Sequence, residues 1–324
     1  MTLFARLARA VAAVAILAAA CGAQAQSWPS KPVRMYVPLP PGTAPDIVAR
    51  LIADKLGGLW GQPVVVENRP GAGGIPTMSA LSRAAPDGYT IALVPASVVT
   101  LTPLLFKDPQ FNADKDVTPL ATAGLSPMMV VVNPSSSIQT LGDLIKTVKA
   151  SPGKVNFASP GANTVPFLTG DMLNRAAGIQ LYSVPYNGSV ASVTATMSGE
   201  AVVCIDGLPP MIPHVKSGKL RAIAVTSSQR LPGYENIPTA AETLPGFESI
   251  GWFAVFAPSG VPAPVVERVN ADVNRVMAMP DIVARLAELG VYPNPAPQKQ
   301  VEQFYAQQRA LWRKVVNDVG LQPQ

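Results

Sequence analysis

The stretch VRMYVPLPPGTAPDIVARLIADKL (residues 33–56) joins a short apolar strand to an amphipathic helix through a turn rich in Gly and Pro. The stretch KVNFASPGANTVPFLTGDML (residues 154–173) repeats this design. Such a turn leaves backbone N–H groups free at a helix N-terminus, where the helix dipole favours negative charge. Two such turns, in separate halves of the chain, predict one anionic ligand held from both sides. The expected elements are strands 33–37 and 154–158 and helices 47–56 and 167–173.

Short apolar strands alternate with helices from residue 33 to about 290. This alternation predicts an α/β fold, with a parallel or mixed sheet covered by helices on both faces. The C-terminal third has no strand-helix series of its own. The other expected strands are 64–67, 89–94, 128–132, 181–184, 202–205, 220–225 and 252–256, and the expected C-terminal helices are 264–277, 280–289 and 298–319.

The simplest arrangement of these elements has two domains. The chain crosses into a second domain near residue 125 and returns near residue 248, so that two crossing strands form a hinge with the ligand cleft between the domains. We expect one domain over 26–125 together with 248–324, and the other over 126–247.

The N-terminus, residues 1–25, reads as a signal peptide. Arg6 and Arg9 give a positive start, an apolar run follows, and the small residues before Ala25 form a cleavage site. The apolar run is too short for a transmembrane helix. The residues before Cys21 also resemble a lipoprotein signal, but Leu17 lies one place too far from this cysteine. The sequence therefore favours soluble export to the periplasm over a lipid anchor.

Composition excludes several classes of function. The net charge is +5 and no run of Lys and Arg marks a nucleic-acid surface. The one cysteine beyond the signal peptide, Cys204, lies in an apolar strand and predicts a packed thiol rather than a disulfide. His214 is the only histidine, and no G-x-S-x-G motif is present. We therefore expect no catalytic residues, no metal site and no cofactor.

Four short motifs resemble those of one known family. They are ENRPGAGG (67–74), PDGYT (86–90), VPYNG (184–188) and GKLRAIAV (218–225). In this order and spacing the chain, from Trp28 to about Asn294, resembles the solute receptors of tripartite tricarboxylate transporters, the Bug family. The resemblance implies a type II periplasmic binding protein of the Venus flytrap form. It implies that the protein captures a small organic carboxylate and delivers it to membrane permease subunits, and we expect a monomer.

In that family, two turns, one in each domain, hold the ligand carboxylate largely through backbone amides. They correspond here to residues 39–46 and 159–164. Thr164 replaces a glycine of the family pattern, and Phe167 replaces a histidine or similar polar residue. Leu39, Phe167 and Trp252 favour an aromatic or branched ligand body. The expected ligand-binding residues are Leu39, Pro41, Gly42, Thr43, Ala44, Asp46, Ser97, Ser159, Gly161, Ala162, Asn163, Thr164, Tyr186, Asn187 and Asp206.

Two acidic residues in this set have alternative roles. Thr43 and Asp46 fit an S/T-x-x-D capping box, and capping is favoured over ligand contact. Asp206 follows a strand and either orients neighbouring groups or caps a helix. Two other functions of the whole chain also stay open: a carboxylate-handling enzyme on the same architecture, and a ligand-sensing subunit for a membrane sensor kinase.

Overall fold

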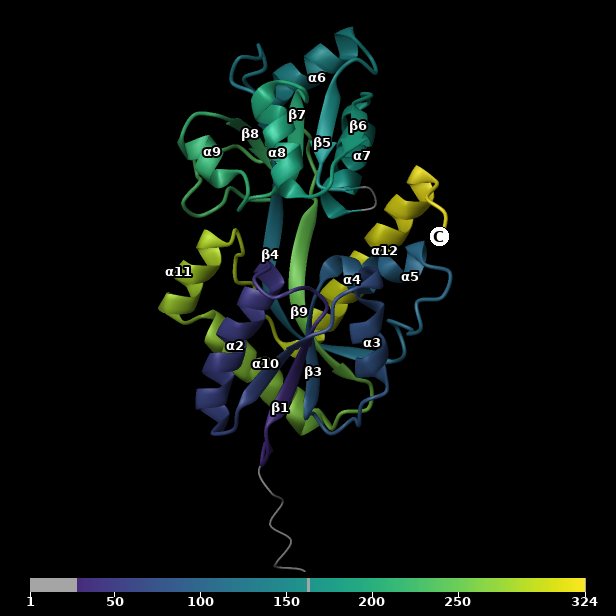
Figure 1. The fold of residues 1–324 in the computed structure, drawn as a ribbon, viewed down its shortest axis with the longest axis vertical. Coiled ribbons are helices and arrows are strands. Elements are labelled where there is room, and N and C mark those ends of the chain that lie inside the picture. The colour runs from purple at the N-terminus through teal and green to yellow at the C-terminus, as the bar shows by residue number, and fades with distance from the viewer. Residues whose placement is uncertain (1–27, 162–163, 324) are drawn as a thin grey trace, which may run out of the picture.

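The computed structural model describes residues 28–161 and 164–323. They form two lobes joined at a narrow waist (Figure 1). The expected signal peptide, the cleavage near Ala25 and Cys21 lie outside the described residues, as do Ala162 and Asn163.

The lower lobe is built on a mixed sheet. Strands β1 (Val33–Val37), β2 (Val64–Asn68) and β3 (Thr90–Pro95) are parallel, with β1 in the middle. Strand β9 (Ile250–Pro258) pairs antiparallel with β3 and also with β4 (Val117–Val132). The parallel strands follow from the helical crossovers that connect them, because a crossover returns the chain in the same direction.

The upper lobe continues from β4. Strand β5 (Asn156–Ser159) is parallel to β6 (Tyr182–Pro185) and β7 (Val203–Gly207), and the end of β4 lies antiparallel between β7 and β8 (Arg221–Val225). Strand β4 pairs with β9 over residues 117–127 and with β7 over 128–132, so it runs through both lobes (Figure 1).

Helices cover both faces of each sheet, as the strand pattern predicts. In the lower lobe these are α2 (Ala44–Trp60), α3 (Ile75–Ser82), α4 (Ala96–Thr100), α5 (Thr102–Leu105), α10 (Ala263–Met277) and α11 (Pro280–Glu288). In the upper lobe they are α6 (Leu141–Ala150), α7 (Val165–Ala177), α8 (Ser189–Ser198) and α9 (Ile212–Lys216). Short 3₁₀ turns occur at η1 (Ala72–Gly74) and η2 (Ala240–Glu242). Within the described ranges, none of the helices combines the length and the apolar character needed to cross a membrane.

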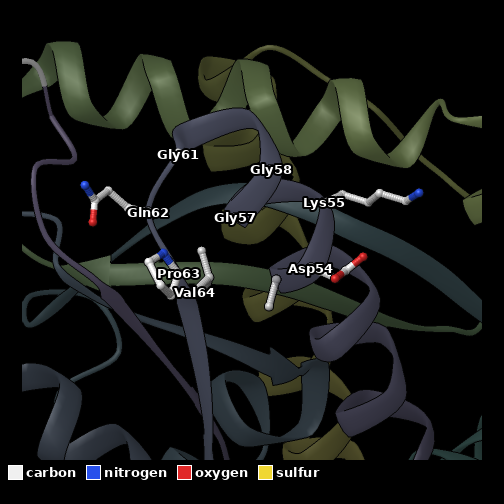
Figure 2. A pocket seen from close by; sticks show the side chains of 9 residues that line it. Asp54, Lys55, Gly57, Gly58, Gly61, Gln62, Pro63 and Val64 are labelled. Atoms are coloured by element: carbon white, nitrogen blue, oxygen red, sulfur yellow. The ribbon is translucent and has the colours of Figure 1, made fainter.

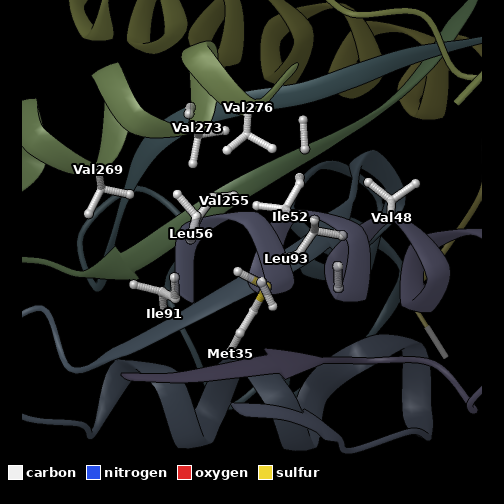
Figure 3. Packing of buried hydrophobic residues seen from close by; sticks show 14 of the residues in the cluster. Met35, Val48, Ile52, Leu56, Ile91, Leu93, Val255, Val269, Val273 and Val276 are labelled. Carbon is white, nitrogen blue, oxygen red and sulfur yellow. The ribbon is translucent and has the colours of Figure 1, made fainter. Parts of the chain in front are cut away.

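In the core of the lower lobe, two helices, α2 and α10, pack on one face of the sheet (Figure 3). Val269, Val273 and Val276 recur at helical spacing on α10 and are fully buried. They face α2 and the strands. Burial of each such side chain contributes roughly 1.5–3 kcal/mol to the free energy of folding. The strand and helix residues they pack with include Met35, Ile52, Leu56, Ile91, Leu93 and Val255.

The last helix, α12 (Gln298–Val319), belongs to both lobes. Near its middle, Tyr305 packs edge-on against Phe256, with ring centroids 5.3 Å apart, in the lower lobe. Further along, Trp312 is fully buried in the cluster that holds Phe157 and other upper-lobe residues. The domain boundaries near residues 125 and 248 stay a prediction.

The expected two-lobed α/β fold is confirmed, and most elements lie within a few residues of their expected places. The largest difference is β4, expected only over 128–132 but beginning at Val117. Pro119 and Gly124 interrupt the apolar pattern in this part, and its pairing with β9 shifts register beside both residues. Its partner strand lies far along the chain, so no local pattern indicates the pairing.

Candidate functional site

A cavity of about 760 Å³ lies between the two lobes, and we call it the cleft. The lower lobe contributes Leu39 after β1, the 71–74 turn after β2, and Ser97 after β3. The upper lobe contributes residues after β5 and Asp206 near the end of β7. In both lobes these segments follow the carboxyl ends of parallel strands, where open α/β sheets place their ligands.

The wall of the cleft is largely apolar. Helices α4 and α5 contribute Val98 and Leu105, and the residues that flank α5 contribute Leu101 and Phe106. Among the described residues that line the cleft, Asp206 is the one ionisable side chain. A ligand would therefore meet hydrocarbon over most of its surface and polar groups at a few points.

The upper lobe presents the N-terminus of α7 to the cleft through Thr164, Val165 and Pro166. The Thr164 hydroxyl accepts a hydrogen bond from the Phe167 N–H at 3.3 Å and donates to the Gly161 carbonyl at 2.8 Å. Pro166 has no N–H and that of Phe167 is taken, so the N–H of Val165 is the one in this first turn with no hydrogen-bond partner identified among the described residues. The turn and the dipole of a thirteen-residue helix favour an anion at this point.

Asp206 lies on the same side of the cleft. It is 5% exposed, and its Oδ1 accepts a hydrogen bond from the Gly207 N–H at 2.7 Å. Its Oδ2 is buried and has no hydrogen-bond partner among the described residues. Burial raises the pKa of this carboxyl, while the Ser189 hydroxyl and the Gly207 N–H act against that rise. The Asp206 carboxyl is therefore a buried group in the wall of the cleft, bonded by the Gly207 N–H and close to the Ser189 hydroxyl.

The lower-lobe turn is arranged differently, because its acid is fully engaged. Asp46 is 2% exposed, and its Oδ2 accepts from the Gly42 N–H at 2.8 Å. The Asn68 amide donates to Oδ1 at 2.8 Å, and Arg50 forms an ion pair with the carboxylate at 3.0 Å. Burial raises the pKa of Asp46, but these hydrogen bonds outweigh it and hold the pKa below its ordinary value. Asp46 therefore stabilises the conformation of this turn through contacts within the lower lobe.

Two expectations for the lower turn are wrong. The capping box is absent, since the Thr43 hydroxyl donates to the Pro40 carbonyl at 2.8 Å and does not cap α2. The Gly42 N–H is not free for an anion, because it donates to Asp46. The Asp46 carboxylate accepts from Arg50, Asn68 and the Gly42 N–H, and not from the Thr43 N–H that a capping box requires.

The expected site residues that the structure describes separate into two groups. Those that line the cleft are Leu39, Ser97, Thr164 and Asp206. Those outside its lining are Pro41, Gly42, Thr43, Ala44, Asp46, Ser159, Gly161, Tyr186 and Asn187. Ser159 is fully buried, and the Tyr186 hydroxyl donates to Glu200 at 2.8 Å. Trp252, expected to contact the ligand body, is instead 1% exposed and packs on Phe304 and Tyr305.

Sequence reasoning missed the wall formed by α4 and α5 and placed little weight on the 71–74 turn. Gly74 has a φ of +87°, and a Cβ there would lie 2.7 Å from a methyl group of Val98. The Thr102 hydroxyl donates to the Gly73 carbonyl at 2.7 Å and fastens the turn to this wall. The glycines of this turn could have indicated the contact from the sequence, because close packing between a turn and a helix requires them.

A second cavity, also of about 760 Å³, lies at the C-terminal end of α2 (Figure 2). It is lined by Gly57, Gly58 and Gly61, with Asp54 and Lys55 at its side. Lys55 already pairs with Asp281 at 2.6 Å. This cavity belongs to the lower lobe alone, whereas the cleft has walls from both lobes, so the cleft is the better candidate site.

The cysteine behaves as the sequence predicts. Cys204 is fully buried, and burial raises the pKa of its thiol to about 12, so the reactive thiolate is suppressed. Across residues 28–161 and 164–323, no three His, Cys, Asp or Glu side chains are placed to hold a metal ion.

Two α/β lobes, crossing strands between them and a shared cleft define the class of bilobal solute-binding proteins. The model of the tripartite tricarboxylate transporter family receptor matches residues 48–321, and the chain belongs to this family. BugT of Bordetella pertussis is 33% identical over 318 residues, which cover 96% of this chain and 98% of BugT. Family members are periplasmic binding proteins, and these relatives are solute-binding receptors rather than enzymes.

Solved structures agree with this assignment. Rpa4515 of R. palustris, determined with adipate, is 28% identical with a TM-score of 0.78, and the match covers 92% of this chain and all of that one. MatC from Rhodopseudomonas palustris, determined with malate, is 30% identical with a TM-score of 0.71 and covers 89% of this chain and all of that one.

Proposed function

We propose that this protein is exported to the periplasm, captures a small organic carboxylate in the cleft between its lobes, and delivers it to the membrane permease of a tripartite tricarboxylate transporter. The observation that carries the proposal is a cavity with walls from both lobes and the N-terminus of α7 among them. Structural relatives with adipate and malate bound support a carboxylate as the ligand.

In this mechanism the ligand carboxylate docks on the main chain at the start of α7. Closure of the lobes then covers the ligand body with the apolar wall of α4 and α5 and excludes water. Hydrogen bonds to a charged group strengthen when water is excluded. The closed form is the state that a permease would recognise.

The anion site can be tested with two variants that differ only in charge. Thr164→Asp and Thr164→Asn both keep a good N-cap for α7, so both are expected to fold. The aspartate adds negative charge where the ligand carboxylate would bind. Calorimetric titration with a panel of dicarboxylates should show at least tenfold weaker binding for Thr164→Asp than for Thr164→Asn. Equal affinities would place the carboxylate elsewhere.

Export can be tested separately. Expression with the full leader, followed by periplasmic extraction and N-terminal sequencing, should give a soluble chain that begins near Gln26. A membrane-bound form with lipid on Cys21 would contradict soluble export without affecting the binding proposal.

A further inference from the structure

A further cavity, of about 370 Å³, also lies between the lobes, and none of the described residues lines both it and the cleft. We call it the rear cavity. Leu125, Pro127 and Ile250 form one side of it, at the place where β4 and β9 pass from one lobe to the other. The lower lobe adds a wall from α11 and the segment after it, and the upper lobe adds the segment after β8.

The crossing strands separate the rear cavity from the cleft. In Figure 1, α11 lies on one side of β4 and β9, whereas α4, α5 and α7, which border the cleft, lie on the other side. Lobes that rotate about crossing strands move as rigid bodies. A rotation that opens the cleft must therefore narrow the rear cavity, and a rotation that closes the cleft must widen it.

Beside the rear cavity the lobes are already in close contact. A Cβ at Gly290, which follows α11, would lie 2.8 Å from the Cβ of Leu208 and 3.1 Å from Pro209 in the upper lobe. The next segment is fixed to the crossing strand, because the main chain of Tyr292 exchanges two hydrogen bonds of 2.8 Å with Leu125. The Tyr292 ring packs against the upper-lobe cluster that contains Leu208. Packed protein atoms resist compression, so little further rotation is possible in the direction that narrows the rear.

We propose that this rear contact limits how far the cleft opens, and that the space left in the rear cavity sets the balance between open and closed forms. A larger side chain can enter a cavity of this size in the described form. Forms with a wider cleft exclude it, because their rear cavity is smaller. Such a substitution should therefore favour closure without changing any residue that lines the cleft. This inference goes beyond the proposed function and holds for any ligand that the closed form binds.

Three variants test the role of the rear cavity. Ala287→Trp places a large side chain in it from α11. Ala284→Trp is the matched control, since Ala284 belongs to the same helix, is exposed and lies outside the lining of both cavities. Ser228→Trp fills the rear cavity from the upper lobe. Ser228 is exposed, so this variant keeps the test decisive if Ala287→Trp does not fold.

Small-angle X-ray scattering of the ligand-free proteins measures the opening of the lobes. Ala287→Trp and Ser228→Trp should each have a smaller radius of gyration than the wild type and than Ala284→Trp. If both rear variants scatter like the control, the rear contact does not limit opening and the inference is overturned.

Calorimetric titration with adipate and with malate measures the consequence for binding. Because apparent affinity rises with the population of the closed form, the rear variants should bind an acid that the wild type binds at least about threefold more tightly. Unchanged affinity in variants with a smaller radius would overturn the link between the rear cavity and ligand capture. If the wild type binds neither acid, that result counts against the proposed function, whereas the scattering still decides the inference.

Discussion

The two strand-turn-helix units at residues 33–60 and 156–177 have the same sequence design but use it differently. In the lower unit, Asp46 is surrounded by donors from its own turn, helix and neighbouring strand. In the upper unit, the Thr164 hydroxyl caps α7, and the acid beside the turn, Asp206, comes from β7 and has one oxygen bonded to the Gly207 N–H. The first acid has both oxygens bonded within its own lobe, and burial raises the pKa of the second. The acids beside the two turns therefore have different environments, although the turns have the same sequence design.

The largest expected effect concerns these two acids. Asp46→Asn removes the charge that Arg50 and two N–H donors share, and we expect the free energy of unfolding to fall by about 2–3 kcal/mol. Asp206→Asn removes a charge that burial disfavours, and we expect the free energy of unfolding to change by no more than about 1 kcal/mol. Urea denaturation of both variants without ligand measures the difference. Equal losses would show that Asp206 is as well satisfied as Asp46 and would remove the contrast.

A second comparison concerns glycines at the two turns of the lower lobe. Gly42 and Gly74 have nearly the same φ, +85° and +87°, so alanine is strained at both. A Cβ at Gly42 meets nothing, whereas a Cβ at Gly74 lies 2.7 Å from Val98. We expect Gly42→Ala to cost about 1 kcal/mol of stability and Gly74→Ala about 2 kcal/mol. If thermal unfolding shows equal losses, the 71–74 turn is not packed tightly on the cleft wall.

The smallest effect is the pH dependence, which should have opposite signs for the two acids. The pKa of Asp46 is lowered in the folded state, so its contribution to stability is present above its unfolded pKa and is lost as pH falls through the folded value. The pKa of Asp206 is raised, so its ionisation destabilises the fold, and protonation removes this penalty as pH falls. Urea denaturation from neutral to acid pH gives the free energy of unfolding of the wild type and of each Asn variant. The difference between variant and wild type, plotted against pH, gives the slope for each acid. Slopes of the same sign would contradict the contrast between the two environments.

The parts of the fold that the sequence predicts well are those set by local pattern. The apolar spacing of 298–319 gives the bounds of α12, and the valines of α10 identify its buried face. The first half of β4 was missed because its pairing with β9 depends on contacts across more than a hundred residues.

The candidate site also has some features that local pattern predicts and others that depend on contacts between distant segments. Strand ends place Leu39, Ser97 and Asp206 at the cleft, since the carboxyl ends of parallel strands share one edge of a sheet. The capping box was wrong because sequence spacing cannot show that Arg50 and Asn68 compete for the Asp46 carboxylate. The surroundings of the Asp206 carboxyl are also not visible in the sequence, because satisfaction of a buried group depends on every segment folded around it.

The C-terminal helix has a consequence for the autonomy of the lobes. A polypeptide cut to residues 126–247 would lack Trp312, Val315 and Val316, and the surface they cover would be bare. Such a fragment should aggregate or be digested rather than fold by itself. For the same reason, the lobes of the intact molecule can open in two ways. Either the part of α12 that carries Trp312 keeps its place on the upper lobe and the helix bends between its two contacts, or the opening is small enough to leave both contacts in place.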